Sequence, residues 1–251
     1  MVNFVGAGCG APDLITVRGA RLLGEADVII YAGSLINPEL LKYAKSSCEL
    51  FDSAFLSLDE IIEIIKNAEE NHKMTVRLQT GDTSIYSALR EQTDRLDALN
   101  IPYEICAGVS SFCGAAAALK AEYTLPDVSQ TVIITRMAGR TAVPEKEKIS
   151  ALASHNTTMI IFLSAGLIKE VIGELLSGGY DKKTPAAIVY KATWKDEKIF
   201  RCTIENLAET ADKNGIKKTA LICVGNFLGD DYSLSKLYDK EFETEYRKAK
   251  K

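Results

Sequence analysis

The chain lacks the features that mark several large classes of protein. It has 251 residues, and no apolar run in it approaches the roughly 18 residues that a membrane-spanning helix needs. Its formal charge of −4 gives no excess of positive charge that would point to nucleic acid or to an anionic membrane. The strand-like Val2–Val5 follows Met1 directly, so we expect no secretory leader and a soluble, cytoplasmic protein.

Metal-binding and disulfide patterns are also missing from the sequence. Among six cysteines no pair has the C-x-x-C spacing, and the two histidines, His72 and His155, lie apart in polar segments. We therefore expect no zinc site and no other bound metal. Most cysteines are predicted to be small core residues in a reducing compartment. Cys9 differs because it lies in a glycine-rich loop, but it has no neighbouring base that would make it a nucleophile.

The chain does contain two series of alternating strand and helix patterns. With 47% hydrophobic residues, it can bury a core in one large domain or two small ones. Tyr123–Gln130 interrupts the alternation with Pro126 and Asp127, and we interpret it as a linker. The prediction is an α/β protein with an N-terminal α/β domain over residues 1–122, a C-terminal α/β domain over 131–228 and a charged surface tail over 229–251.

Apolar periodicity places the individual elements. In the first series, strands are predicted at Val2–Val5, Asp27–Tyr31, Cys48–Phe51, Met74–Leu78 and Tyr103–Cys106, and helices at Thr16–Gly24, Leu58–Asn71, Phe112–Leu119 and from Thr83 to near Leu99. In the second series, strands are predicted at Thr131–Thr135, Met159–Leu163, Ala186–Tyr190, Phe200–Thr203 and Ala220–Val224, and helices at Ala165–Leu176 and Ile204–Asn214. Phe200–Thr203 is expected to be antiparallel.

The stretch Met74–Ala88 is the first candidate for a binding site. A predicted strand ends at a Gly81-Asp82 turn, and Thr83 and Ser84 are good N-cap residues for a following helix. Open α/β sheets bind ligands at turns of this kind, at the carboxyl ends of parallel strands. Taken alone, the stretch fits equally well a turn in which the glycine only permits the bend and the acid only stabilises a helix start.

The loop after the first strand suggests a dinucleotide site. Gly6, Gly8 and Ala11 satisfy a G-x-G-x-x-A pattern, which is typical of nicotinamide-dependent oxidoreductases. However, Pro12-Asp13 delays the helix, and no acid for a ribose hydroxyl follows the second predicted strand after Tyr31. An NAD-dependent oxidoreductase is therefore the minority hypothesis.

Three motifs together carry a resemblance to a known family. Val5–Thr16 resembles the first signature of the tetrapyrrole methylases, Thr80–Asp82 the second and Gly108–Ser111 the third. The similarity runs from Val2 to about Phe227. It implies two α/β domains with the active site in the cleft between them, methyl transfer from S-adenosylmethionine to a tetrapyrrole with S-adenosylhomocysteine as product, and a homodimer.

Three further stretches resemble one branch of that family. Leu125–Ile133, Thr135–Pro144 and Val189–Ile199 are similar to the methylases that act at C11 of precorrin-4 or cobalt-precorrin-4, giving the corresponding precorrin-5 in corrin (vitamin B12) synthesis. A sibling methylase acting at another ring carbon is the nearest alternative, and a non-catalytic tetrapyrrole carrier is another. Ala32 stands where uroporphyrinogen methylases carry an acid, which argues against that branch.

The resemblance implies a cofactor site without basic residues, which suits a sulfonium. The implied cofactor-binding residues are Thr80, Gly81, Asp82, Ile85, Ser110, Ser111, Leu163 and Ala192. For the last two, the alternative is an ordinary core position at a strand end. No catalytic residue is assigned, because direct attack of a ring carbon on the methyl group needs chiefly positioning.

The resemblance also implies which residues hold the tetrapyrrole. Gly8, Cys9 and Gly10 would line the substrate trough, where small residues let a flat macrocycle approach the backbone. Cys9 stands where the family usually has proline. Arg136 and Arg140 would offer forked donors to the substrate's carboxylates, the alternative being that they are solvated loop arginines.

Overall fold

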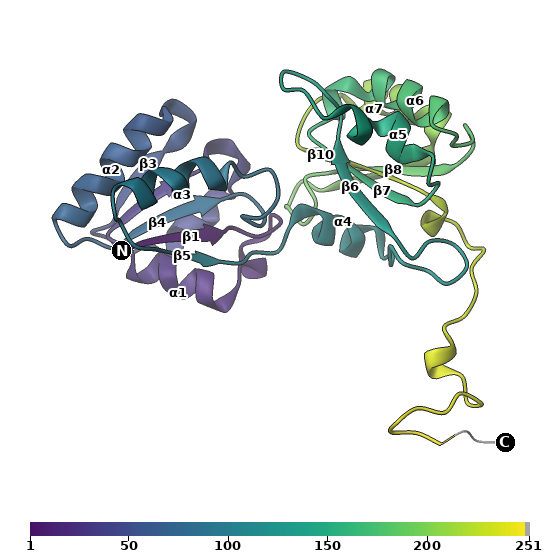
Figure 1. Ribbon diagram of the computed structural model, residues 1–251, viewed down its shortest axis with the longest axis horizontal. Helices are drawn as coiled ribbons and strands as arrows, with labels where there is room; N and C mark the ends of the chain where they lie inside the picture. The colour runs from purple at the N-terminus through teal and green to yellow at the C-terminus, as the bar shows by residue number, and fades with distance from the viewer. Residues whose placement is uncertain (249–251) are drawn as a thin grey trace. The chain divides into compact units, whose positions relative to one another are not determined.

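The computed structural model describes residues 1–248, which form two compact units. The first unit contains Met1–Ala115 and Lys191–Glu197, and the second contains Ala116–Tyr190 and the described chain from Lys198 onward. Each unit is built on a five-stranded sheet with helices packed against it (Figure 1), so the predicted class of two α/β domains is confirmed. In the described part of the chain, no helix is both long and apolar enough to cross a membrane.

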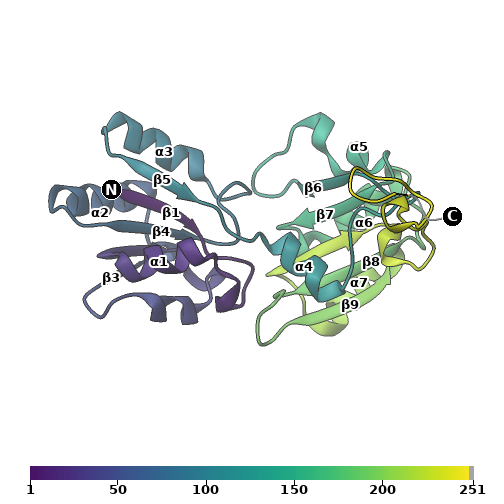
Figure 2. The same ribbon diagram turned by 90° about the horizontal axis from the view of Figure 1, so that it is seen from below.

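The sheet of the first unit is entirely parallel. Its strands follow the order β3-β2-β4-β1-β5, and Figure 2 shows β5, β1, β4 and β3 in that succession across the sheet. The strands are β1 (Val2–Gly6), β2 (Val28–Tyr31), β3 (Glu49–Asp52), β4 (Thr75–Gln79) and β5 (Tyr103–Cys106). Because every strand runs the same way, the loops that follow β4, β1 and β5 leave neighbouring positions on one edge of the sheet.

Helices cover both faces of this sheet because each presents one apolar stripe. On one face, Leu22 and Leu23 of α1 (Val17–Glu25) pack against strand residues that include Ile29 and Val76. On the other face, α2 (Leu58–Glu70) and α3 (Leu89–Ala98) bury Ile61, Ile65 and Leu96 against Phe4 and Ile30. Each such side chain contributes about 1.5–3 kcal/mol when fully buried.

The helix predicted to start at Thr83 is wrong at its N-terminal end. The helix α3 begins only at Leu89, and the segment before it is a series of turns. Tyr86 and Ala88 both have a φ of 53°, a left-handed conformation that an α-helix does not accommodate. Ser84 does not cap a helix, because its N–H and its hydroxyl donate to the carboxylate of Asp82.

A buried arginine connects α3 to the sheet. Arg77 on β4 is 7% exposed and donates from Nε to Oε1 of Gln92 (2.9 Å) and from a terminal nitrogen to the carbonyl of Ile30 (3.1 Å). Burial lowers the pKa of Arg77 to about 10, so the guanidinium stays charged at neutral pH. The sequence patterns had not singled out this residue.

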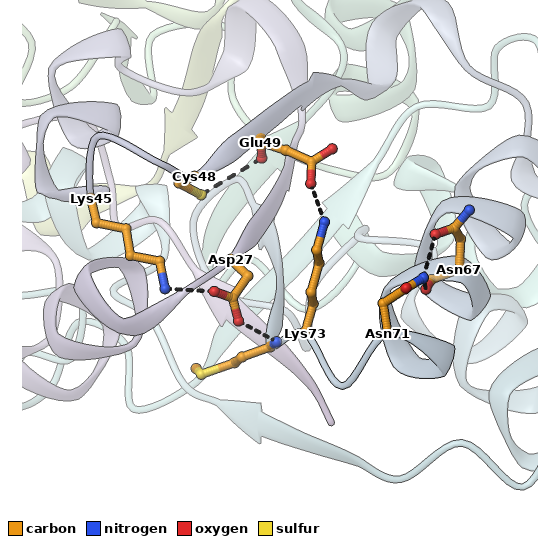
Figure 3. A network of polar contacts seen from close by, with 8 residues as sticks. Asp27, Lys45, Cys48, Glu49, Asn67, Asn71 and Lys73 are labelled. Atoms are coloured by element: carbon orange, nitrogen blue, oxygen red, sulfur yellow. Dashed lines mark hydrogen bonds and ion pairs between the residues drawn. The ribbon is translucent and has the colours of Figure 1, made fainter.

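The amino-terminal edge of the same sheet is joined by exposed ion pairs (Figure 3). Asp27 accepts hydrogen bonds from Lys45 Nζ (2.6 Å) and from the backbone N–H of Met74 (2.8 Å). Lys73 pairs with Glu49 at 2.6 Å. The side-chain hydrogen bond from Lys45 is the main reason that the pKa of Asp27 lies below its usual value. These contacts connect the starts of β2, β3 and β4.

The sheet of the second unit is mixed. Its order is β6-β7-β10-β8-β9, where β6 and β7 are parallel and the other pairings are antiparallel. The strands are β6 (Val132–Arg136), β7 (Thr158–Phe162), β8 (Pro185–Tyr190), β9 (Lys198–Thr203) and β10 (Ala220–Val224). The antiparallel orientation predicted for Phe200–Thr203 is confirmed. The last strand in the sequence lies at the centre of the sheet, which periodicity does not reveal.

Apart from α4 (Ser111–Leu119), which spans the boundary between the two units, the α-helices of this unit cover one face of its sheet (Figure 1). They are α5 (Ile149–Ala153), α6 (Ile168–Ser177) and α7 (Leu207–Asn214). Their buried residues pack with Met159 and Ile188 of the sheet. The short α5 had not been predicted. Because β10 is antiparallel to both β7 and β8, the strands β6, β7 and β8 point the same way and end at one edge.

Candidate active site

Two of the three signature loops are joined by backbone hydrogen bonds. The N–H of Gly8 donates to the carbonyl of Gly81, and the N–H of Gly81 donates to the carbonyl of Gly8, both at 3.1 Å. The N–H of Ala7 donates to the carbonyl of Gln79 at 2.7 Å. The Gly8–Gly81 pair is an isolated antiparallel bridge beyond the end of the parallel β1–β4 pairing, and it joins motifs more than 70 residues apart in the sequence.

The third loop meets the other two through glycines. A Cβ atom on Gly6 would lie 2.6 Å from Cα of Gly108 and 2.7 Å from the carbonyl oxygen of Gly81. Both distances are shorter than a real Cβ contact, so three backbones pack where only glycine fits. Gly81 also has a φ of 66°, the left-handed region that favours glycine. Close approach therefore requires glycine at position 6, whereas at position 81 the positive φ favours it.

Asp82 holds the second and third loops together. Its Oδ2 accepts the backbone N–H of Gly108 at 2.7 Å, and its Oδ1 accepts the N–H of Ser84 at 2.9 Å and the Ser84 hydroxyl. Partial burial alone would raise the pKa of Asp82, but the hydrogen bonds from Ser84 and Gly108 outweigh it and lower that pKa. The carboxylate is thus a brace between loops as well as a negative charge at the candidate site.

The expected cofactor residues fall mostly in the first unit. Seven of the eight belong to it, namely Thr80, Gly81, Asp82, Ile85, Ser110, Ser111 and Ala192. Thr80 is exposed, whereas Ser110 and Ala192 are each 6% exposed. The set offers hydroxyls, backbone groups and one carboxylate, with no cationic side chain. That chemistry fits a methyl donor that carries a sulfonium and polar ends.

Leu163 belongs to the second unit, directly after β7. It is 70% exposed and has a φ of 53°, a conformation that is strained for a leucine. Its neighbour Ser164 is fully buried and accepts the N–H of Met137 at 2.8 Å while donating to the carbonyl of Phe162 at 2.6 Å. This hydroxyl, which sequence reasoning missed, connects the loops after β6 and β7.

The residues expected to bind the tetrapyrrole include a tightly held glycine loop. Gly8, Cys9 and Gly10 are all buried. Asn37, 8% exposed, donates from Nδ2 to the carbonyl of Gly10 at 2.9 Å. No pattern in the sequence had marked Asn37. The loop is thus fixed by a side chain from a distant turn.

The geometry of this loop does not match a dinucleotide fold. A short 3-10 turn, Pro12–Leu14, follows the glycine loop, and α1 begins only at Val17, where Thr16 accepts the N–H of Gly19. The glycines therefore do not lead into a helix N-terminus that would hold a pyrophosphate. This agrees with the expectation drawn from Pro12-Asp13.

The two candidate arginines differ in their surroundings. Arg136 ends β6 and donates to the backbone carbonyls of Thr141 (3.2 Å) and Ala142 (2.8 Å). Its guanidinium therefore shapes the following loop. Arg140 lies within that loop and is exposed. Of the pair, Arg140 has the side chain that solvent reaches freely, and it is the better candidate for contact with a substrate carboxylate.

The chain belongs to the tetrapyrrole (corrin/porphyrin) methylase family, whose model matches residues 1–208. Over the full chain it is 55% identical to a cobalt-precorrin-4 C(11)-methyltransferase of Methanocaldococcus jannaschii, covering 97% of that protein. It is 45% identical to the protein of the same name from Priestia megaterium, over 99% of this chain and 98% of that one. This confirms that the chain is a member of a methyltransferase family.

Solved structures give the same relationship. The X-ray structure of a cobalt precorrin-4 methyltransferase, a cobalamin biosynthetic enzyme, superposes with a TM-score of 0.89 at 44% identity, covering 91% of this chain and 96% of that one. A Thermus thermophilus uroporphyrin-III C-methyltransferase, solved with S-adenosylhomocysteine, superposes with a TM-score of 0.76 at 24% identity, covering 90% and 92%. The second likeness concerns the fold alone.

Proposed function

We propose that this chain transfers a methyl group from S-adenosylmethionine to C11 of cobalt-precorrin-4, or of precorrin-4, in corrin synthesis. The observation that carries the proposal is the convergence of the three signature loops at one edge of the parallel sheet, joined through Gly6, Gly81 and Gly108. The full-length identity to methyltransferases named for this carbon supports the choice of C11 over other ring carbons. The chain is 32% identical to a uroporphyrinogen-III methyltransferase of Bacillus subtilis, a clearly more distant relative.

In this proposal, the loops after β4 and β5 bind the methyl donor. When bound, S-adenosylmethionine supplies an electrophilic methyl group on a cationic sulfur. Asp82 keeps the two loops in register through the N–H of Gly108. Thr80, Ser110 and Ser111 then offer hydroxyls for the polar ends of the cofactor. Ile85, Ala192 and Leu163 are assigned as its apolar contacts.

The glycine loop and the loop after β6 are assigned to the tetrapyrrole. Gly8, Cys9 and Gly10 are assigned to it because small residues permit close approach of a flat ring. Arg136 shapes its loop, and Arg140 offers a forked donor to a carboxylate. We assign no general base, because holding the ring carbon in line with the methyl group can supply about 7–11 kcal/mol of the barrier reduction.

The same resemblance supports a homodimer acting in the cytoplasm, which we include in the proposal. Sedimentation of the purified protein at several concentrations measures its mass directly. A mass of one chain at all concentrations would contradict the dimer and leave the assignment of the reaction untouched.

The first experiment is a calorimetric titration with S-adenosylhomocysteine. The folded wild type should bind it, and Asp82→Ala and Ser110→Ala should each weaken binding. Asp94→Ala is the matched control, since Asp94 is an exposed carboxylate on α3 that pairs with Arg90 at 2.5 Å. Incubation with cobalt-precorrin-4 and labelled S-adenosylmethionine, followed by NMR of the product, identifies the carbon. Absence of binding by wild type, or binding of NAD instead, would overturn the proposal.

A further inference from the structure

The hairpin loop between β8 and β9 is strained and firmly held. Lys191 has a φ of 47° and Thr193 a φ of 67°. For a β-branched residue such as threonine, this left-handed conformation is an outlier, which persists only where surrounding contacts impose it. The contacts that hold Thr193 in this conformation therefore offset the strain in its backbone.

Thr193 makes those contacts with the glycine loop of the same unit. Its Oγ1 accepts the backbone N–H of Ala11 at 2.9 Å and lies 3.6 Å from Sγ of Cys9. Its own N–H donates to Oε2 of Glu197 at 2.6 Å. The side chain of Thr193 thus hydrogen-bonds to the glycine loop, and its backbone hydrogen-bonds within its own loop.

The neighbouring Trp194 packs against Gly10 of the glycine loop. A Cβ on Gly10 would lie 2.6 Å from Nε1 of Trp194 and 2.6 Å from the carbonyl oxygen of Ala192. Lys191 Nζ lies 5.2 Å from the centre of the Trp194 ring and 2.6 Å from Asp196. The loop Lys191–Glu197 therefore packs directly on the glycine-loop backbone of its own unit, which is expected to face the tetrapyrrole.

We propose that Thr193 is a positioning residue for the tetrapyrrole, which it serves by fixing the backbone from Cys9 to Ala11. This inference rests on the proposed function and adds to it a residue that makes no substrate contact of its own. The hydroxyl accepts a hydrogen bond from the Ala11 N–H. This bond holds the loop in one conformation, whereas its glycines would otherwise allow it to adopt many. Loss of the hydroxyl frees the glycine loop and weakens binding of the tetrapyrrole more than binding of the methyl donor, to which this hairpin loop contributes only Ala192.

The test compares Thr193→Val, which removes the hydroxyl and keeps the shape, with Thr193→Ser, which keeps the hydroxyl. Thr131→Val, at an exposed position before β6, is the control. We expect Thr193→Val to raise KM for cobalt-precorrin-4 about five- to tenfold, the loss of one hydrogen bond. We expect kcat and the Kd for S-adenosylhomocysteine to change less than about twofold, and Thr193→Ser to restore KM.

Hydrogen exchange at the Ala11 amide provides a second readout. We expect the exchange rate to be higher in Thr193→Val than in wild type. If the valine variant does not fold, Thr193→Ala must show the same increase in KM. An unchanged KM, or an equal rise in KM and in the Kd for S-adenosylhomocysteine, would overturn the inference while the proposed function stands. Failure of wild type to bind S-adenosylhomocysteine or to transfer the methyl group would instead overturn the proposed function.

Discussion

The two edges of the first sheet are held together by different means. At the amino-terminal edge, the pairs Lys45–Asp27 and Lys73–Glu49 connect strand starts through partly exposed side chains (Figure 3). At the carboxyl-terminal edge, glycine backbones pack against one another and Asp82 bridges two loops. Flexible charged side chains tolerate replacement, because water takes over their solvation. Packed backbones do not, so the sequence is constrained most strongly where the candidate site lies.

Gly6→Ala should give the largest effect and tests the packed edge directly. The added methyl group would lie 2.6 Å from Cα of Gly108, a backbone atom that moves only with its loop. We expect a loss of about 2–3 kcal/mol in unfolding free energy, measured in urea, and loss of S-adenosylhomocysteine binding.

Gly24→Ala on α1 is the control for that variant. Its Cβ would meet only Tyr43 O at 3.5 Å, an ordinary contact, and alanine is the better helix former by up to about 1 kcal/mol. This variant should be as stable as wild type or more so. If Gly6→Ala behaved in the same way, the close-packed edge would be refuted.

Asp82→Asn should have the next largest effect, about 1–2 kcal/mol at pH 7, because charged acceptors make stronger hydrogen bonds than neutral ones. The pKa of Asp82 is lowered in the folded protein, chiefly by Ser84 and Gly108 acting against partial burial. Its contribution is therefore present in full above the unfolded pKa of about 3.9 and is lost as pH falls through the folded pKa.

Urea unfolding of wild type and Asp82→Asn from pH 7 down to about pH 3 measures this difference. The gap between the two proteins should be constant at the upper end of this range and narrow near its lower end. If the difference in unfolding free energy between the two proteins increased on acidification, the Asp82 carboxylate would not stabilise the contact between the two loops.

Leu163→Gly extends the comparison to the second sheet, at the edge where β6, β7 and β8 end. The left-handed backbone costs an L-residue roughly 1–2 kcal/mol, partly offset by glycine's greater freedom when unfolded, so stability should rise by up to about 1 kcal/mol. If Leu163 contacts the cofactor, affinity for S-adenosylhomocysteine should fall by about tenfold as apolar burial is lost.

Thr219→Gly is the matched control, since Thr219 has a φ of 57° and precedes β10 in the same unit. It should gain stability in thermal melts without any change in affinity. Equal affinities for the two glycine variants would remove Leu163 from the cofactor site.

Glu49→Gln should give the smallest effect and tests the ion-paired edge. Lys73 and Glu49 are solvent-accessible, and an exposed pair of this kind is weakened by water and salt. The urea midpoint and the affinity for S-adenosylhomocysteine should both equal those of wild type. If Glu49→Gln lost as much unfolding free energy as Gly6→Ala, the two edges of the sheet would not differ in how they tolerate substitution.

Local patterns predicted most elements to within a few residues. The strand Ala220–Val224 and the helix starting at Leu58 were correct because periodicity and capping residues act over short distances. The helix start after Gly81-Asp82 was misplaced by several residues. Ser84 bonds to Asp82, and positive φ values at Tyr86 and Ala88 postpone α3 to Leu89. Ser84 is a good N-cap residue, but it hydrogen-bonds to Asp82 instead, and the local pattern does not reveal this.

The sequence by itself determined the two α/β series, the three signature motifs and the family to which they belong. Only the tertiary structure decided that β10 lies at the centre of its sheet and that Gly6, Gly81 and Gly108 meet. It also decided that Thr193 reaches Ala11. Periodicity and capping depend on neighbours within one or two turns of chain, whereas these contacts join residues from about 25 to more than 180 positions apart. Only packing brings such residues together.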